Sequence, residues 1–410
     1  MKKLIAVLLA IVMLMGLCAC AAKEEQAPAA QESETKTETA APEKEEAAPE
    51  KEEAADPIVV KVGLVSPLTG DMAEKGLNQE TAAKLAIDEI NENGGILNGK
   101  YIFELISEDD AGTPNNSVTV ATKLITQDEV NVLVGSLPST CTLAIMDVTE
   151  SYGVTQIAPS STAASITQQG NEYIFRNAAS DAVIVAGLID YAKNTFGYTK
   201  FGVISDTTDF GLGGGNCARD LINADPDLEL VYDELYTFGD TDFSVQMTKM
   251  EAAAPEVVIG WGDSTSFYRL TQQINTSGLD VTFMTGTAAA SQAIYDTIGE
   301  DAAGVYFGTP FTVANPDPRV QEFAKKFEAV AGYAPDMNAA QNYDAIYMIK
   351  EAIEACDSID STDIRDAIRS LVDIQGVAGV MNFDETGESN KSISMCQITG
   401  GDANSVVYCE

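Results

Sequence analysis

The chain has 410 residues, a formal net charge of −39 at pH 7, and no histidine. So large an acidic excess repels nucleic-acid phosphates and anionic lipid, which argues against nucleic acid as a partner. Without histidine the chain cannot form a Ser/His/Asp or Cys/His nucleophile or a His-containing zinc site, and we expect neither a metal nor a cofactor.

Residues 1–20 are expected to be a secretion signal. Two lysines precede an unbroken apolar run from Leu4 to Leu17. This run is too short to span ~30 Å of hydrocarbon at ~1.5 Å per helical residue. The following Leu17-Cys18-Ala19-Cys20 resembles a bacterial lipobox, which implies that Cys20 is lipidated and anchors a secreted protein at the outer face of the cytoplasmic membrane. A plain cleaved signal with incidental cysteines is the alternative.

Residues 21–57 are expected to form a disordered acidic tether. They contain no aromatic residue, so they cannot bury enough apolar surface to offset the entropy of ordering. A short Ala/Glu/Lys helix is the alternative, but Pro28, Pro42 and Pro49 would interrupt it.

Strand-like and helix-like segments alternate beyond the tether, which predicts an α/β fold with parallel-rich sheets. One series begins at Ile58–Val65, and a second begins after Arg176 and Asn177 and includes the strand Phe201–Ser205. Two series of similar size predict two Rossmann-like lobes joined by a hinge, with the chain crossing back near Gly308. The predicted lobes are 58–179 plus 309–381 for lobe 1, and 180–308 plus 382–410 for lobe 2.

Three further features lie in the second half of the chain. The stretch Gly211–Gly215 lacks the GxGxxG spacing and a P-loop lysine, so we interpret it as a flexible loop over a cleft and not as a nucleotide site. Val380–Phe383 and Ser392–Ile398 are predicted to form a closing hairpin. Cys396 and Cys409 could form a disulfide if their strands align, which the sequence does not decide.

Two neighbouring strands of the first series end in hydroxyl-rich loops, the place where open α/β sheets bind ligands. The first loop carries Ser139 and Thr140, and the second carries Ser160, Ser161 and Thr162. Hydroxyls and free backbone N–H groups at a helix start can hold a carboxylate, although the helix dipole alone adds only ~0.3–1 kcal/mol. Ordinary helix caps are the alternative, but two adjacent loops of this kind favour a binding site.

Aromatic residues follow two strands of the second series. We expect Phe210 and Trp261 to wall a cleft, since a large flat side chain covers a ligand at low entropic cost. A core position for Trp261 is the alternative.

Short motifs throughout residues 58–410 carry a family resemblance. They include the run from Val62 to Gly70, Gly94-Gly95-Ile96, Ala158-Pro159-Ser160-Ser161-Thr162, Tyr173-Ile174-Phe175-Arg176 and Asn382-Phe383-Asp384. Together they resemble the leucine/isoleucine/valine-binding proteins of ABC importers, which have the type I periplasmic-binding-protein fold. The resemblance implies that the lobes close on a ligand by hinge motion and that the closed form docks on a membrane permease.

The resemblance also implies roles for individual residues. It implies that Ser139, Ser160 and Thr162 bind the α-carboxylate of the ligand, while Phe210 and Trp261 close from the second lobe.

One position departs from the family pattern. Members that bind leucine, isoleucine or valine carry a Glu that pairs with the ligand ammonium, and this chain has Thr287 there. A buried unpaired ammonium costs several kcal/mol, against ~8 kcal/mol for a micromolar affinity. Either Asp206, Asp209 or Asp263 replaces the Glu, or the ligand has no amine.

Lys75 is a second departure, because the family often has an aromatic residue at this position. A lysine there could favour a second anionic group on the ligand, and an exposed lysine on the loop rim is the alternative.

The sequence is compatible with three functions. The leading interpretation is a receptor that captures an amino acid or related small carboxylate for an ABC importer without chemical change. A lipoprotein that senses a small molecule for a signalling partner is the second, and neighbouring permease genes would separate the two. The third is a hydrolase that uses two carboxylates among Glu108, Asp109, Asp110 and Asp263, but acidic clusters are common in so acidic a chain.

Overall fold

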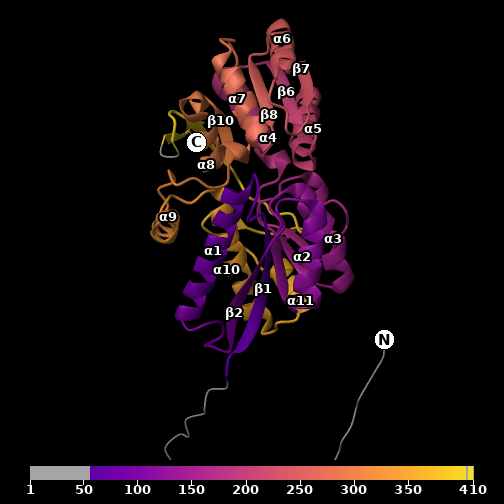
Figure 1. The fold of residues 1–410 in the computed structure, drawn as a ribbon, viewed down its shortest axis with the longest axis vertical. Helices are drawn as coiled ribbons and strands as arrows, with labels where there is room; N and C mark the ends of the chain where they lie inside the picture. Colours follow the sequence, from indigo (N-terminus) through magenta and orange to yellow (C-terminus); the bar gives the residue numbers. More distant parts are fainter. Residues whose placement is uncertain (1–55, 403–404, 410) are drawn as a thin grey trace, which may run out of the picture. The chain divides into compact units, whose positions relative to one another are not determined.

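The computed structural model describes residues 56–402 and 405–409 of the chain (Figure 1). The predicted secretion signal, the lipobox at Cys20 and nearly all of the tether lie outside the described residues, so these remain predictions. Within the described ranges, no helix combines the length and apolar composition needed to cross a bilayer.

The first sheet has five parallel strands in the order β2-β1-β3-β4-β5. They are β1 (Ile58–Ser66), β2 (Tyr101–Asp109), β3 (Val132–Gly135), β4 (Thr155–Ala158) and β5 (Ile174–Arg176). From Val62 onward every residue of β1 is buried. Strands of a parallel sheet covered on both faces are near-continuous apolar runs, which is the pattern of this segment.

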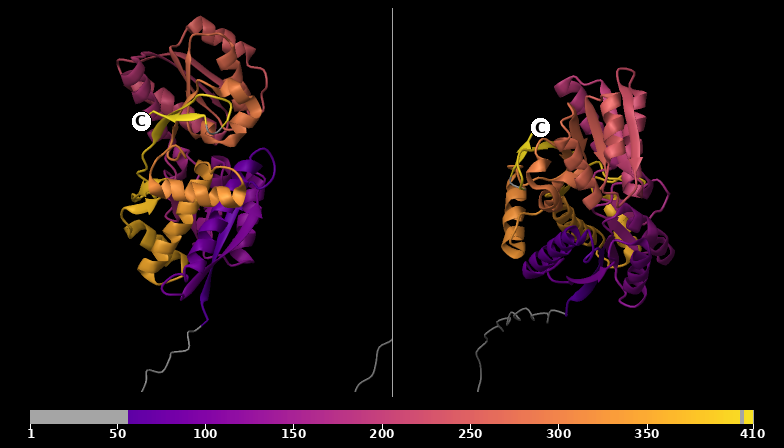
Figure 2. Two further views of the ribbon diagram at one scale, coloured as in Figure 1. Left: turned by 90° about the vertical axis from the view of Figure 1, so that its left-hand side faces the viewer. Right: turned by 45° about the horizontal axis from the view of Figure 1, so that its top comes forward.

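Helices cover both faces of the first sheet, and we call this assembly the first lobe. One face packs against α1, α9, α10 and α11, and the other against α2 and α3. Their bounds are α1 (Ala73–Glu92), α2 (Pro114–Thr126), α3 (Ser139–Tyr152), α9 (Pro318–Ala331), α10 (Met337–Cys356) and α11 (Ser361–Ser370). Helix α1 lies along α10 although the two are far apart in the sequence (Figures 1 and 2).

The second sheet has seven strands in the order β14-β13-β10-β9-β8-β6-β7. Strands β6 to β10 are parallel, while β13 and β14 are antiparallel additions at one edge. The strands are β6 (Lys200–Asp206), β7 (Glu229–Tyr236), β8 (Val257–Trp261), β9 (Thr282–Thr285), β10 (Tyr306–Thr309), β13 (Ser394–Ile398) and β14 (Val406–Tyr408).

We call this second sheet with its helices the second lobe. Helices α4 and α5 pack on one face, and α6, α7 and α8 pack on the other. The helices are α4 (Asp181–Tyr191), α5 (Asp209–Ala224), α6 (Ser244–Ala253), α7 (Thr265–Thr276) and α8 (Gln292–Ile298). Short helical turns are η1 (Ala164–Ile166), η2 (Ala192–Phe196), η3 (Thr287–Ala290) and η4 (Gly299–Ala302).

Two predictions for the second half of the chain are wrong. Gly211–Gly215 lie inside helix α5 and not in a flexible loop. The two strands of the predicted closing hairpin do not pair with each other, because β12 (Gly379–Met381) pairs with β11 (Ile374–Gly376), while β13 pairs with β10 and β14. The antiparallel contact at the predicted turn is the bridge between Phe383 and Ser389. Cys396 and Cys409 are both free thiols in this structure.

The predicted α/β fold with parallel-rich sheets is confirmed. In each lobe the first strand in the sequence lies inside the sheet, so the strand order reverses between β1 and β3 and again between β6 and β8. Ligands of open α/β sheets bind outside the carboxyl ends of the strands at such reversals. The lobe boundaries remain predictions, because the sheets alone do not define where each lobe ends.

Candidate ligand-binding site

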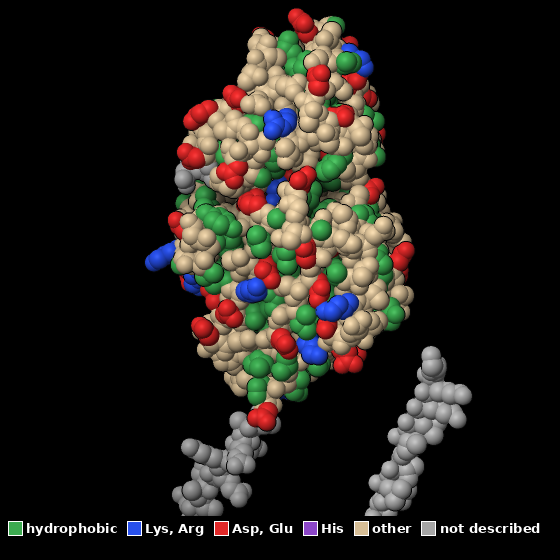
Figure 3. All heavy atoms as spheres, in the orientation of Figure 1, with side chains coloured by type: hydrophobic (Ala, Val, Ile, Leu, Met, Phe, Trp, Pro, Cys, Tyr) green, Lys and Arg blue, Asp and Glu red, His purple; other side chains and the backbone are tan. Residues whose placement is uncertain are grey.

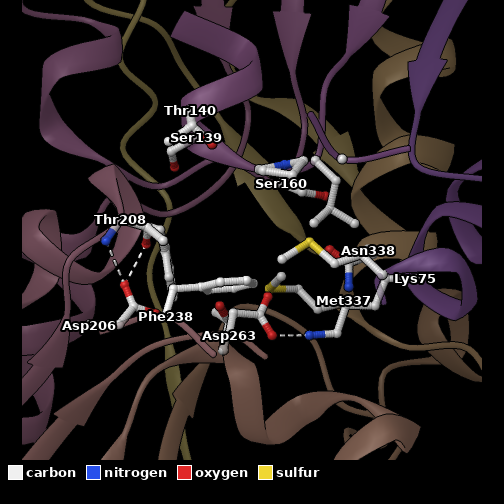
Figure 4. Close-up of a pocket in the computed structure, with 16 residues that line it drawn as sticks. Lys75, Ser139, Thr140, Ser160, Asp206, Thr208, Phe238, Asp263, Met337 and Asn338 are labelled. Carbon is white, nitrogen blue, oxygen red and sulfur yellow. Dashed lines mark hydrogen bonds and ion pairs between the residues drawn. The ribbon is translucent and has the colours of Figure 1, made fainter. Parts of the chain in front are cut away.

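A cavity of about 190 Å³ lies where the carboxyl ends of strands from both lobes face each other. The first lobe contributes residues that follow β1, β2, β3 and β4, together with the start of α10. The second lobe contributes residues that follow β6, β7, β8 and β9. The lining residues are Met72, Lys75, Gly112, Leu137, Pro138, Ser139, Thr140, Ser160, Asp206, Thr208, Phe210, Phe238, Asp263, Thr287, Met337 and Asn338 (Figure 4).

The start of helix α3 supplies unpaired backbone donors to this cavity. The carbonyl of Pro138 accepts from the N–H groups of Cys141 and Thr142, at 3.0 Å each. The N–H groups of Ser139 and Thr140 precede these and have no intrahelical acceptor. Both residues line the cavity. Their N–H groups, together with the positive end of the helix dipole, suit an anionic group.

Ser160 carries a hydroxyl whose direction is set by Gln79. The Oγ of Ser66 donates to Oε1 of Gln79 at 2.6 Å, which leaves the amide Nε2 of Gln79 to donate to Oγ of Ser160 at 2.9 Å. Because Ser160 accepts this hydrogen bond, its own O–H remains available to donate. Ser160 therefore offers a directed donor at the cavity wall.

Ser161 and Thr162 do not line the cavity. The hydroxyl of Ser161 bonds to Thr142 at 2.7 Å and to the carbonyl of Leu137 at 2.9 Å, which joins the loops after β3 and β4. The Nη1 of Arg176 donates to the carbonyls of Thr162 and Ala163, at 2.8 and 2.6 Å. These residues position the loop that carries Ser160.

Asp206 presents a carboxylate from the end of β6. Its Oδ1 accepts from the backbone and the hydroxyl of Thr208, at 2.9 and 2.5 Å, while Thr208 caps α5 through Gly211 (Figure 4). Burial raises the pKa of Asp206, and the carboxylate of Asp263 adds to the rise. Two acidic groups thus line the second-lobe side of the cavity.

Phe210 lines the cavity, whereas Trp261 lies behind it. Trp261 is buried, and its ring centroid is 6.0 Å from that of Phe210. A Cβ on Gly214 or Gly286 would lie 2.1 or 2.6 Å from the Trp261 ring, so both glycines make room for it. Trp261 is therefore a core residue, as the alternative prediction had it, and the prediction that it walls the cleft is wrong.

Lys75 and Asp263 form an ion pair that crosses from one lobe to the other (Figure 4). Lys75 Nζ also donates to the hydroxyl of Tyr268 at 2.9 Å, and that hydroxyl donates to Asp263 at 3.2 Å. Burial of Lys75 opposes its charge, but Asp263 and Tyr268 outweigh this effect and raise its pKa. The alternative of an exposed rim lysine is wrong, since the Lys75 side chain is 5% exposed.

Of the remaining predicted residues, Thr287 lines the cavity and Asp209 does not. Among the four candidate hydrolase carboxylates only Asp263 lines it. Asp109 instead accepts from the loop at Leu68 and Thr69. The described part of the chain holds no cluster of three or more side chains placed to bind a metal ion.

Sequence reasoning missed several lining residues. Met72, Gly112, Phe238, Met337 and Asn338 all reach the cavity. For Met337 and Asn338 a signal was available, because Asp336 caps α10 by accepting from the N–H of Ala339 at 2.8 Å. A capping Asp marks the helix start, and helix starts are where such folds place ligand contacts.

These features define a two-lobed α/β protein with a small cavity between its lobes that is lined by both polar and apolar side chains. A family model described as periplasmic binding protein matches residues 59–402. The chain belongs to this family, whose members are binding proteins.

Curated relatives agree in name. The Leu/Ile/Val-binding protein BraC3 of Rhizobium johnstonii is 29% identical over 349 residues, which cover 83% of this chain and 92% of that protein. The leucine-, isoleucine-, valine-, threonine-, and alanine-binding protein of Pseudomonas aeruginosa is 29% identical over 331 residues, covering 80% and 87%.

Solved structures share the fold. The branched-chain amino acid transporter substrate binding protein LivJ from Streptococcus pneumoniae, in complex with isoleucine, has a TM-score of 0.78 at 25% identity, covering 86% of this chain and 99% of that one. A solute binding protein from R. palustris in complex with benzoate has a TM-score of 0.75 at 19% identity, covering 85% and 95%. These neighbours hold two chemically different carboxylates in one fold.

Proposed function

We propose that this protein is the ligand-capturing receptor of an ABC importer and that it binds an amino acid or a related small carboxylate between its lobes. The observation that carries the proposal is the set of donors at one wall of the cavity. The N–H groups of Ser139 and Thr140 and the hydroxyl of Ser160 come from two neighbouring loops, and both loops have supporting hydrogen bonds. A carboxylate accepts several such donors at once, and each charge-assisted bond is stronger than a neutral one.

The other end of the ligand faces the second lobe. A ligand ammonium is received there by Asp206 in place of the family Glu, since Asp206 lines the cavity, Asp263 is paired with Lys75, and Thr287 cannot carry a charge. Phe210 covers the ligand from the same side. Ser161, Thr162 and Trp261 do not line the cavity, and they support the binding loops and the Phe210 ring.

The receptor works by reversible binding without chemical change. The lobes 58–179 plus 309–381 and 180–308 plus 382–410 close on the ligand by hinge motion, and the closed form docks on a membrane permease. Lipid on Cys20 and the tether at 21–57 keep the receptor at the outer face of the cytoplasmic membrane. Acidic side chains spread over the face in Figure 3 suit a protein that stays soluble while tethered.

A thermal-shift screen of refolded, ligand-stripped residues 58–410 tests the proposal. The panel contains amino acids, amides, dicarboxylates and benzoate. A ligand at a hundredfold over its Kd adds ~2.7 kcal/mol to the unfolding free energy, which raises the melting temperature by several degrees. Recovery of the bound compound unchanged separates a receptor from a hydrolase. Stabilisation by no carboxylate in the panel would contradict the proposal.

A further inference from the structure

The charged groups that line the cavity are one cation and two carboxylates among the described residues, and their pairing restricts the ligand. Lys75 and Asp263 are already paired with each other across the cavity. Asp206 is held by Thr208 on one oxygen only. Because Lys75 is paired with Asp263, its charge is already compensated when a ligand enters the cavity.

The Lys75–Asp263 pair is shielded from solvent as well as close. The two side chains are 5% and 20% exposed, so water screens the interaction weakly. Tyr268 is buried next to them, bonds to both, and places its ring 5.6 Å from Nζ of Lys75. A pair in such surroundings resists separation, because either partner alone is a buried charge without compensation.

Asp206 is left for the ligand ammonium, and the rest of the cavity wall offers no further charge to a ligand side chain. Met72, Leu137, Pro138, Phe210 and Met337 supply apolar surface. An acidic ligand side chain would face Asp206 and Asp263 and would have to take Lys75 from its partner. A basic one would have to take Asp263 from Lys75.

We propose that the Lys75–Asp263 pair is a charge filter that restricts the receptor to ligands with an uncharged side chain. The inference rests on the proposed function and deepens it, because it excludes acidic and basic amino acids by a pair that belongs to the protein itself. From the sequence, Lys75 could favour a second anionic group on the ligand. A lysine already paired with Asp263 is not available to bind that group.

Substitution of Asp263 should admit acidic ligands, and substitution of Lys75 should admit basic ligands. Asp263→Asn removes the carboxylate that is bonded to Lys75, so glutamate and aspartate should bind about 10- to 100-fold more tightly than they bind the wild type. Lys75→Met leaves Asp263 uncompensated, and the same gain should appear for lysine and arginine. The double variant should gain neither class.

Two control variants separate charge from packing. Tyr268→Phe removes hydrogen bonds from the same cluster without changing its charge, so it should gain no acidic or basic ligand. Glu234→Gln breaks the Lys249–Glu234 pair on β7 and α6, whose residues do not line the cavity, and should leave the ligand preference unchanged.

Isothermal titration calorimetry with leucine, valine, glutamate, aspartate, lysine and arginine gives the measurement, with a melting curve for each variant. Wild-type protein that binds glutamate or lysine as tightly as leucine would overturn the filter and leave the proposed function intact. So would a cooperatively folded Asp263→Asn variant that gains no acidic ligand. If the wild type binds no amino acid or other small carboxylate, the proposed function and the filter both fail. The wild-type panel tests the filter even if a variant does not fold.

Discussion

Gln79 donates a hydrogen bond to Ser160 at 2.9 Å while it accepts one from Ser66 at 2.6 Å. With Oε1 of Gln79 accepting from Ser66, the amide Nε2 faces Ser160, so the hydroxyl of Ser160 is an acceptor toward Gln79 and can donate toward the cavity. A residue of α1 thus determines how a residue of the loop after β4 meets the ligand. Gln79 itself is buried and does not line the cavity.

Gln79→Met should therefore weaken ligand binding from outside the cavity. Methionine has a similar volume but no amide, so Ser160 loses the bond that orients it. The net value of one hydrogen bond is ~1 kcal/mol, which corresponds to a fall in affinity of about five- to tenfold. Gln321→Met, on α9 and away from the cavity, is the control in the same titration. Unchanged affinity in Gln79→Met would show that the orientation of Ser160 does not matter.

Gly214→Ala should destabilise the protein and weaken ligand binding together. The new Cβ would lie 2.1 Å from the Trp261 ring, which in turn stacks near Phe210. Overpacking of a core costs ~1–3 kcal/mol, which exceeds the helix propensity of ~1 kcal/mol that alanine regains over glycine. The exposed Asn216→Ala in the same helix should change the melting temperature little. Equal melting temperatures for the two variants would contradict the packing role of Gly214.

The glycines of α5 also illustrate what the sequence could and could not predict. The alternation of strands and helices and the loop positions follow from local hydrophobic periodicity, and the carboxyl ends of parallel strands share one edge, so Ser139 and Ser160 were predictable. Glycine has low helix propensity, so the sequence predicted a loop at Gly211–Gly215. The structure shows that Gly214 lies in a helix and makes room for the Trp261 ring. Phe238 reaches the cavity from the loop after β7, whose approach to the first lobe depends on the contact between the lobes, and no local pattern encodes that contact.

Asp181 should make stability depend on pH. Its carboxylate is buried beside Thr162 and Trp261, but neither side chain reaches either oxygen with good hydrogen-bond geometry. Burial raises its pKa to about 7 from 3.8, although Thr162 and Arg176 oppose the rise. The folded state therefore binds a proton that the unfolded state has already released, and the stabilising contribution of this proton is lost as pH rises from about 4 through 7.

Asp181→Asn removes this titration. The melting temperature of the variant, relative to wild type, should increase between pH 4 and pH 7 and level off above pH 7, where both states of the wild type have lost the proton. Glu388 and Arg176, whose charges act on the carboxyl group of Asp181, remain in both proteins, so their contribution cancels to first order. A constant difference across this range would show that Asp181 does not titrate there.

Asp344→Asn should be the most destabilising of these changes. Asp344 and Lys391 are 2% and 0% exposed with 3.5 Å between Oδ2 and Nζ, and Asp344 also accepts the backbone N–H groups of Val377 at 2.7 Å and Ala378 at 3.0 Å. Burial lowers the pKa of Lys391 and raises that of Asp344, so each charge depends on the other. Removal of one partner from a buried pair costs ~3–5 kcal/mol, because the other charge stays buried without compensation.

A double variant distinguishes this cause from the loss of packing. Asp344→Asn with Lys391→Met removes both charges and should recover much of the stability lost in the single variant, since an apolar side chain tolerates burial. Lys350→Met breaks the more exposed Lys350–Glu354 pair on α10 and should cost at most ~1 kcal/mol in the same urea unfolding series. If the double variant were as unstable as Asp344→Asn, the two backbone hydrogen bonds to Asp344, and not its charge, would account for the loss.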